Sequence, residues 1–139
     1  MADESLEALL AGCLEDPDGG PPLSVPTRQV VIAESLAGRE VELVSSLDLG
    51  QRLALVSDEN THRVLGNRVA ETLDGRVRLQ EVRLRGHPYA DLETVEEIRR
   101  EAVGCDAYLA AGAGTINDLC KYAAALDDKP YAVLSLIHI

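Results

Sequence analysis

The sequence predicts an α/β domain, in which a parallel sheet carries helices on both faces. Short β-rich runs alternate with segments of helical spacing along most of the chain, which is the pattern of βαβ units. One run, Arg52–Ser57 (RLALVS), is almost continuously apolar, as expected of a strand buried on both faces of a parallel sheet. Right-handed crossovers between such strands place helices on both sides of the sheet.

The composition is that of a soluble globular chain with an acidic surface. Of its 139 residues, 46% are hydrophobic and 27% are charged, which is enough for one domain with a sizeable core. The formal net charge of −11 argues against nucleic acid as a partner, because a phosphate backbone needs a basic surface. It does not exclude a small phosphorylated ligand held by backbone N–H groups.

The sequence also favours a cytoplasmic location without a membrane partner. No apolar run reaches the roughly 18 residues of a membrane span, and the acidic start MADESLEALLAG lacks the basic segment of a secretion signal. Three scattered cysteines without a CxxC motif are typical of reduced thiols. The three histidines have no metal-ligand spacing, so we expect no metal site within this chain.

The N-terminal stretch, residues 1–22, is expected to lie outside the α/β domain. Residues 3–14 have their leucines on one side of a short amphipathic helix. The segment Asp16–Pro22 (DPDGGPP) then predicts a linker or turn, because glycine and proline end helices. We therefore expect the α/β domain to occupy residues 23–134.

Three strands are expected in the first half of the domain. The β-rich run Arg28–Ile32 (RQVVI) predicts the first strand, and a helical segment follows around Leu36–Leu47. The second strand is Arg52–Ser57, and Glu59–Leu73 has apolar residues at helical spacing. Val77–Leu84 (VRLQEVRL) alternates with period two, which predicts a third strand with one exposed face.

Two further strands and two helices are expected in the second half. A loop at Gly86–Tyr89 (GHPY) precedes an amphipathic helix at Leu92–Val103. A fourth strand at Ala107–Ala110, a helix at Thr115–Leu126 and a last strand at Pro130–Leu134 follow. Ligands of such sheets bind beyond the carboxyl ends of the strands. The loops SDENT and GAGTIND, which follow the second and fourth strands, are therefore the candidate sites.

Two glycines open the loop after the fourth strand and suggest a phosphate site. Gly112 and Gly114 allow a backbone with positive φ and a close approach to an anion. The free N–H groups at the start of the next helix carry the positive end of the helix dipole. The pattern is incomplete, since Asn117 stands where the dinucleotide fingerprint has its third glycine.

A purely structural interpretation of the same residues is equally open. Thr115 and Asp118 have the spacing of a capping box, which would satisfy the free N–H groups without a ligand. Asp58 follows a strand and precedes a helix, so it is a candidate helix N-cap. Alternatively, its carboxylate accepts hydrogen bonds from the ribose hydroxyls of an adenosine.

The stretch GAGTINDLCKYAA followed by KPYAV resembles the glycine-motif segment of sn-glycerol-1-phosphate dehydrogenases, above all the bacterial branch. Their superfamily includes dehydroquinate synthase, glycerol dehydrogenase and the iron-containing alcohol dehydrogenases. LALVSDENT resembles the second strand and adenosine loop of the same proteins. The resemblance runs from about Val25 to Leu134, and it implies the Rossmann-like N-terminal domain of the dehydroquinate synthase-like fold.

The resemblance implies a site for NAD or NADP. The positions that match the family's cofactor contacts are Asp58 at the adenosine ribose, Gly112, Ala113, Gly114 and Thr115 at the pyrophosphate, and Asp118 facing the cofactor. The carboxylate of Asp58 would repel a 2′-phosphate, which favours NAD without deciding the question. The chain has Gly112-Ala113 where the family has Gly-Gly or Gly-Ser, a small departure from its pattern.

The resemblance also implies what this chain lacks. In the family, a Thr-containing loop and a helical C-terminal domain follow, and this domain supplies an Asp and two His to a catalytic divalent metal. Here the sequence reads LSLIHI and stops, so neither a catalytic residue nor a metal ligand of the family is present. We expect residues 135–139 to be foreign to the family and the reading frame to be truncated. Zinc or nickel, and possible pairing as a homodimer, belong to the full-length enzyme.

Three functions stay open on the sequence. The first is the cofactor-binding half of an oxidoreductase that transfers hydride between dihydroxyacetone phosphate and sn-glycerol 1-phosphate, inactive as this fragment. The second is part of a lyase of the dehydroquinate synthase type, whose loop runs into Gly-Asp-Leu where this chain has Asn117-Asp118-Leu119. The third is a stand-alone, non-catalytic nucleotide-binding module.

Overall fold

The computed structural model describes residues 4–31 and 35–135. Contacts divide the chain into two compact units, Met1–Leu36 and Ala37–Ile139, and each is described by itself below. The expected domain boundary after residue 22 and the expected foreign tail at 135–139 stay predictions, and residues 136–139 lie outside the described part. None of the helices in the described part is long and apolar enough to cross a bilayer.

The first unit contains one helix and a turn that is held by hydrogen bonds. Helix α1 spans Glu4–Leu10, which is shorter than expected. Leu23 N donates to Leu14 O over 2.7 Å, and the Asp16 carboxylate accepts from the N–H groups of Asp18 and Gly20 at 3.0 and 3.1 Å. The DPDGGPP segment is therefore a closed turn. No described residue of this unit is buried.

The prediction of a strand at Arg28–Ile32 is wrong for the residues that the structure describes. Arg28–Val31 have no strand structure, and Ile32 lies outside the described residues. Val30 is an exposed apolar residue in this segment. A β-rich run becomes a strand only when a neighbouring segment supplies hydrogen-bond partners and a surface to pack on. No strand of the described part pairs with it.

The second unit confirms the α/β fold with a parallel sheet. Its four strands lie in the order β2-β1-β3-β4, and every neighbouring pair is parallel. The strands are β1 (Arg52–Asp58), β2 (Arg78–Leu84), β3 (Ala107–Ala111) and β4 (Tyr131–Leu134). The helical segments are α2 (Glu40–Ser46), α3 (Glu59–Thr61), η1 (His62–Gly66), α4 (Asn67–Leu73), α5 (Leu92–Glu101) and α6 (Thr115–Asp127).

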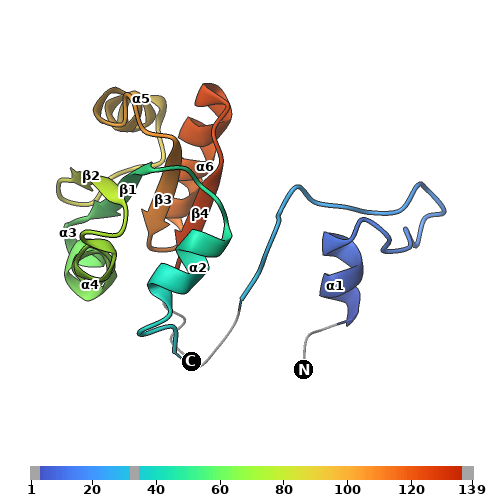
Figure 1. Cartoon of the computed structure of the whole chain (residues 1–139). Coiled ribbons are helices and arrows are strands. Elements are labelled where there is room, and N and C mark those ends of the chain that lie inside the picture. The colour runs from blue at the N-terminus through green and yellow to red at the C-terminus, as the bar shows by residue number, and fades with distance from the viewer. Residues whose placement is uncertain (1–3, 32–34, 136–139) are drawn as a thin grey trace. The chain divides into compact units, whose positions relative to one another are not determined.

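Helices cover both faces of this sheet (Figure 1). Helices α5 and α6 pack on one face, where Ala54, Val56 and Tyr108 join their apolar side chains in one buried cluster. The π-helical turn η1 contacts β1 and β3, while α4 contacts β2 and α2. The central strand β1 is buried from Leu53 to Ser57, which explains why its sequence is apolar without alternation.

Two expected helices differ in detail from the structure. The segment Glu59–Leu73 is helical throughout, but a π-helical turn at His62–Gly66 interrupts it. A Cβ at Gly66 would lie 3.3 Å from the Ser57 side chain, so the helix passes very close to β1. Helix α2 begins at Glu40 rather than near Leu36, because Gly38 has a φ of +84°, which no helix accommodates.

Candidate functional site

Two strand-to-helix junctions meet at the carboxyl edge of the sheet. Strands β1 and β3 are parallel neighbours, so the loops that follow them leave the sheet at the same edge. They also touch, because a Cβ placed on Gly112 would lie 2.9 Å from the methyl carbon of Thr61. The sequence-predicted residues Asp58 and Gly112–Asp118 are therefore brought to one edge.

The junction after β1 is closed by its own side chains. Asp58 is the N-cap of α3, and its Oδ1 accepts from Thr61 N at 2.7 Å. In return, Asp58 N donates to Thr61 Oγ1 over 2.9 Å. This reciprocal capping box confirms the N-cap interpretation of Asp58. Its expected contact with an adenosine ribose stays a prediction.

The first glycine of the loop after β3 is needed for packing. Gly112 is buried, has a φ of +139° and donates its N–H to Leu134 O over 2.9 Å. Any side chain here would meet Thr61 and would also strain the backbone. Gly112 thus allows the two loops to lie against each other.

The second glycine has a different role. Gly114 is the N-cap of α6, with φ +58° and ψ −121°, a conformation that essentially only glycine adopts. An added Cβ would have no atom within 4 Å, so space is open on the exposed side of the loop. Ala113 and Gly114 are both exposed.

The capping box expected from Thr115 and Asp118 is wrong. Gly114 rather than Thr115 is the N-cap, and no side chain caps the helix. Thr115 is already the first helical residue, so its hydroxyl is one position too late to cap. Asp118 is exposed, and its N–H donates to Gly114 O over 2.9 Å.

The start of α6 consequently leaves backbone donors unsatisfied. The N–H groups of Thr115, Ile116 and Asn117 have no acceptor among the described residues. They point along the axis of a 13-residue helix, where the helix dipole favours an anion. Beside them, the buried Oδ1 of Asn117 has no hydrogen-bond partner in the described part of the chain. The three backbone N–H groups suit an anion such as a phosphate, whereas the Asn117 oxygen is an acceptor and adds nothing to such a site.

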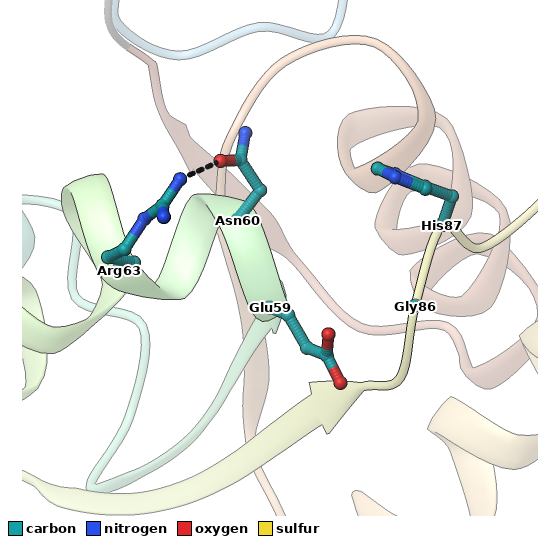
Figure 2. A pocket seen from close by; sticks show the side chains of 5 residues that line it. All are labelled: Glu59, Asn60, Arg63, Gly86 and His87. Atoms are coloured by element: carbon teal, nitrogen blue, oxygen red, sulfur yellow. Dashed lines mark hydrogen bonds between the residues drawn. The ribbon is translucent and has the colours of Figure 1, made fainter.

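A pocket of about 220 Å³ lies at the same edge, between the loops after β1 and β2. Its lining residues are Glu59, Asn60, Arg63, Gly86 and His87 (Figure 2). Arg63 Nη2 donates to Asn60 Oδ1 over 2.8 Å. Sequence reasoning missed these residues, although it noted both loops. The available signal was that SDENT and GHPY each follow a strand.

Two of the ionisable groups with clearly shifted pKa values, Tyr108 and Asp127, lie at the other end of the sheet. Asp127, at the end of α6, accepts from Arg99 Nη2 at 2.7 Å and from the buried Tyr108 hydroxyl at 2.6 Å. These hydrogen bonds, chiefly that from Arg99, lower the pKa of the Asp127 carboxyl. Tyr108 is the second residue of β3, so this network lies at the opposite end of the sheet.

Metal ligands do not gather in the part of the chain that is described. Within residues 4–31 and 35–135, no three His, Cys, Asp or Glu side chains are grouped as a metal site requires. Cys105 and Cys120 are buried, and Cys13 is exposed. Burial raises the pKa of the Cys120 thiol to about 12, which keeps it protonated and a poor metal ligand.

Two solved structures that the chain resembles in fold are a glycerol dehydrogenase and a probable glycerol dehydrogenase. The chain is 17% identical to glycerol dehydrogenase from Schizosaccharomyces pombe, with a TM-score of 0.59 over 70% of this chain and 25% of that one. It is 23% identical to a probable glycerol dehydrogenase from Sinorhizobium meliloti 1021, with a TM-score of 0.53 over 70% and 26% of the two chains. This chain thus spans about a quarter of their length.

The sequence itself carries the family assignment. No curated protein matches it. A family model described as iron-containing alcohol dehydrogenase matches residues 31–135, which include the whole described sheet and both candidate loops. The chain therefore belongs to the iron-containing alcohol dehydrogenase family.

Proposed function

We propose that this chain is the NAD(P)-binding part of an oxidoreductase that interconverts dihydroxyacetone phosphate and sn-glycerol 1-phosphate. The observation that carries the proposal is the uncapped start of α6, where Gly114 leaves open space and three N–H groups lack an acceptor within residues 4–31 and 35–135. The stretch GAGTINDLCKYAA that forms this site resembles the corresponding segment of glycerol-1-phosphate dehydrogenases.

The chain's own residues bind and orient the dinucleotide. Its pyrophosphate lies at the N–H groups of Thr115, Ile116 and Asn117, and Gly114 keeps the approach free of a side chain. Asp58 holds the ribose hydroxyls through Oδ2, since Oδ1 is used by the helix cap. When bound, the nicotinamide accepts or supplies the hydride. The acidic chain therefore needs no basic side chain for the pyrophosphate.

The phosphorylated substrate and a catalytic zinc or nickel ion are assigned to residues outside these 139. That assignment is consistent with a chain that spans about a quarter of the glycerol dehydrogenases it resembles in fold. The family description, alcohol dehydrogenase, also favours a dehydrogenase over a lyase of the dehydroquinate synthase type. Asn117 before Asp118, where the lyase has glycine, points the same way.

Two experiments test this function. Titration with NADH or NADPH, followed by dihydronicotinamide fluorescence, should give saturable binding to one site, and Gly114→Val should abolish it. Absence of dinucleotide binding would contradict the proposal. The source DNA should continue in frame past Leu134 into a helical domain with an Asp and two His. A genuine stop codon there would leave the stand-alone module as the better description.

A further inference from the structure

The two borders of the sheet differ in charge. Strands β2 and β4 are the outer strands of the described sheet (Figure 1). Strand β2 carries three exposed charged side chains, Arg78, Glu81 and Arg83, and charged residues commonly protect a strand edge from pairing with another strand. Strand β4 (YAVL) has no charged residue. The β4 border is therefore the one at which a further strand can pair.

The hydrogen bonds between β3 and β4 determine which groups face the outer side of β4. Pro130 O and Leu134 O each accept a hydrogen bond from the side of β3, at 3.1 and 2.9 Å. Successive residues of a strand point their backbone groups to opposite sides, so those of Tyr131 and Val133 point away from β3. In the described part of the chain, no strand pairs with them. Two N–H donors and two carbonyl acceptors are thus available on this edge.

Apolar side chains accompany these backbone groups. Tyr131 and Val133 are 36% and 37% exposed. Their register partners in β3 belong to the buried cluster beneath α5 and α6, so both side chains lie on the α6 face of the sheet. Helix α6, which contacts β4, adds the exposed side chains of Tyr122 and Leu126. Within residues 4–31 and 35–135, the apolar face of the sheet therefore reaches this border partly uncovered.

The β4 edge is complementary to itself. When two copies of β4 lie antiparallel with Ala132 facing Ala132, Tyr131 of each copy is opposite Val133 of the other. The free backbone groups then form two hydrogen bonds in each Tyr–Val pair. Each pair also brings an aromatic ring against a β-branched side chain, a favourable cross-strand combination. Lys129 is opposite Ser135 in this register, so no like charges face each other.

We propose that β4 is a dimerisation edge, at which a second copy of this chain extends the four-stranded sheet into one continuous sheet. The two-fold axis passes beside Ala132 and is perpendicular to the sheet, so α6 of both copies lies on the same face. The pairing ends at two copies, because each copy has one uncharged edge. The proposal concerns assembly rather than cofactor binding, and it stands independently of the proposed function.

The small size of this interface predicts a weak dimer. The contact consists of a four-residue strand and the exposed side chains of α6 beside it, whereas a standard stable interface involves about 20–30 residues on each side. We therefore expect monomers at about 1 µM and dimers at about 1 mM. The net charge of −11 opposes association at low ionic strength, so the dimer fraction should rise with salt concentration.

The register is tested by disulfide trapping of the full chain. Cys13→Ser removes the exposed thiol and serves as the background. Ala132→Cys should then cross-link two copies on mild oxidation, because Ala132 and its counterpart form a non-hydrogen-bonded pair with Cα atoms about 4.5 Å apart. Val133→Cys is the matched control. Its counterpart lies two residues out of register, more than about 7 Å away, and should not cross-link.

Association itself is measured by sedimentation equilibrium. The original chain should change from monomer to dimer as its concentration rises. Tyr131→Lys should weaken association by about tenfold or more, since it removes both Tyr–Val pairs and places a charge on the edge. Tyr89→Lys is the charge-matched control, because Tyr89 is 78% exposed and lies outside β4, and it should leave association unchanged. Circular dichroism checks that each variant keeps its fold.

Each alternative gives a different result. A monomer at every concentration would overturn the proposal and would mean that another segment covers β4 or that its edge stays unpaired. Equal cross-linking of Ala132→Cys and Val133→Cys would contradict the register. Unchanged association of Tyr131→Lys would exclude β4 as the interface, and assemblies larger than a dimer would contradict the closed pair.

Discussion

The two strand-to-helix junctions at the carboxyl edge of the sheet differ in how they treat the free N–H groups at the start of the next helix. After β1, Asp58 and Thr61 bond each other's backbone in a capping box, and the junction is complete without a ligand. After β3, Gly114 occupies the N-cap position and offers no side chain. The comparison distinguishes residues with a structural role, Asp58 and Thr61, from Gly114, which leaves backbone donors accessible. The phosphate site that we propose lies at the open junction, where the donors are backbone groups, so the acidic charge of the chain does not exclude it.

The largest effect is expected where the two junctions touch. Gly112→Ala should lower the free energy of unfolding by about 2–4 kcal/mol, since it adds backbone strain and overpacking against Thr61. Thr61 cannot turn away without breaking the capping box. Chemical denaturation measures the loss, and Gly114→Ala, whose Cβ meets nothing within 4 Å, isolates the strain alone.

A double mutant sharpens this comparison. Thr61→Ser removes the methyl carbon that lies 2.9 Å from the added Cβ but keeps the hydroxyl of the cap. Gly112→Ala should therefore cost less in the Thr61→Ser background than in the original chain. The same cost in both backgrounds would mean that the loops do not press on each other at Thr61.

Substitution of Asp58 tests whether the closed junction also binds the dinucleotide. Asp58→Asn keeps an N-cap acceptor of similar quality, so the melting temperature should change little. Affinity for NADH should fall by about 1–3 kcal/mol if the charge holds the ribose hydroxyls. Fluorescence titration measures this, and an unchanged dissociation constant would restrict Asp58 to its cap.

The hydrogen-bond network at the other end of the sheet supplies a control away from both junctions. The folded-state pKa of Asp127 is lowered chiefly by Arg99, so the ionised carboxylate stabilises the fold above its unfolded pKa of about 4. That contribution is lost as the pH falls through the folded pKa. Asp127→Asn should cost about 1–2 kcal/mol at pH 7 and less below pH 4.

Melting curves at pH 7 and pH 3 decide this point. The difference between Asp127→Asn and the original chain should shrink at the lower pH, and NADH affinity should not change. A difference that stays constant with pH would show that ionisation of Asp127 contributes nothing to stability.

The smallest effect is expected at Thr115. As the first helical residue it makes no capping hydrogen bond, so Thr115→Ala should change the free energy of unfolding by less than about 0.5 kcal/mol. Thermal melting measures it. A loss near 1 kcal/mol, typical of a removed N-cap, would restore the capping interpretation and weaken the contrast between the two junctions.

The sheet was predictable because its strands carry local signals. Arg52–Ser57 is almost continuously apolar, and the observed β1 extends it by one residue, Asp58. The run at Arg28–Val31 forms no strand within the described residues, and composition does not reveal whether a run has a strand to pair with. The π-helical turn ends at Gly66, which lies close to Ser57, and periodicity cannot show such a contact between separate elements.

The two loops of the candidate site were predictable from the sequence, whereas the contacts that they make were not. Gly112 and Gly114 marked the loop, but their separate roles depend on φ and on Thr61. The choice between Thr115 and Gly114 as N-cap turns on a single residue, and helix ends are the least certain feature of a sequence pattern. The pocket escaped prediction because Asn60 and His87 meet only when β2 lies beside β1, and strand order is not encoded locally.

The central claim, that the open junction holds the dinucleotide pyrophosphate through backbone donors, is tested most directly by amide NMR. The uniformly ¹⁵N-labelled chain is titrated with NADH, and shifts are followed residue by residue. The account predicts the largest amide shifts at Thr115, Ile116 and Asn117, with the Thr61 amide of the closed junction changing less. Saturable NADH binding that leaves the three α6 amides unmoved would contradict it.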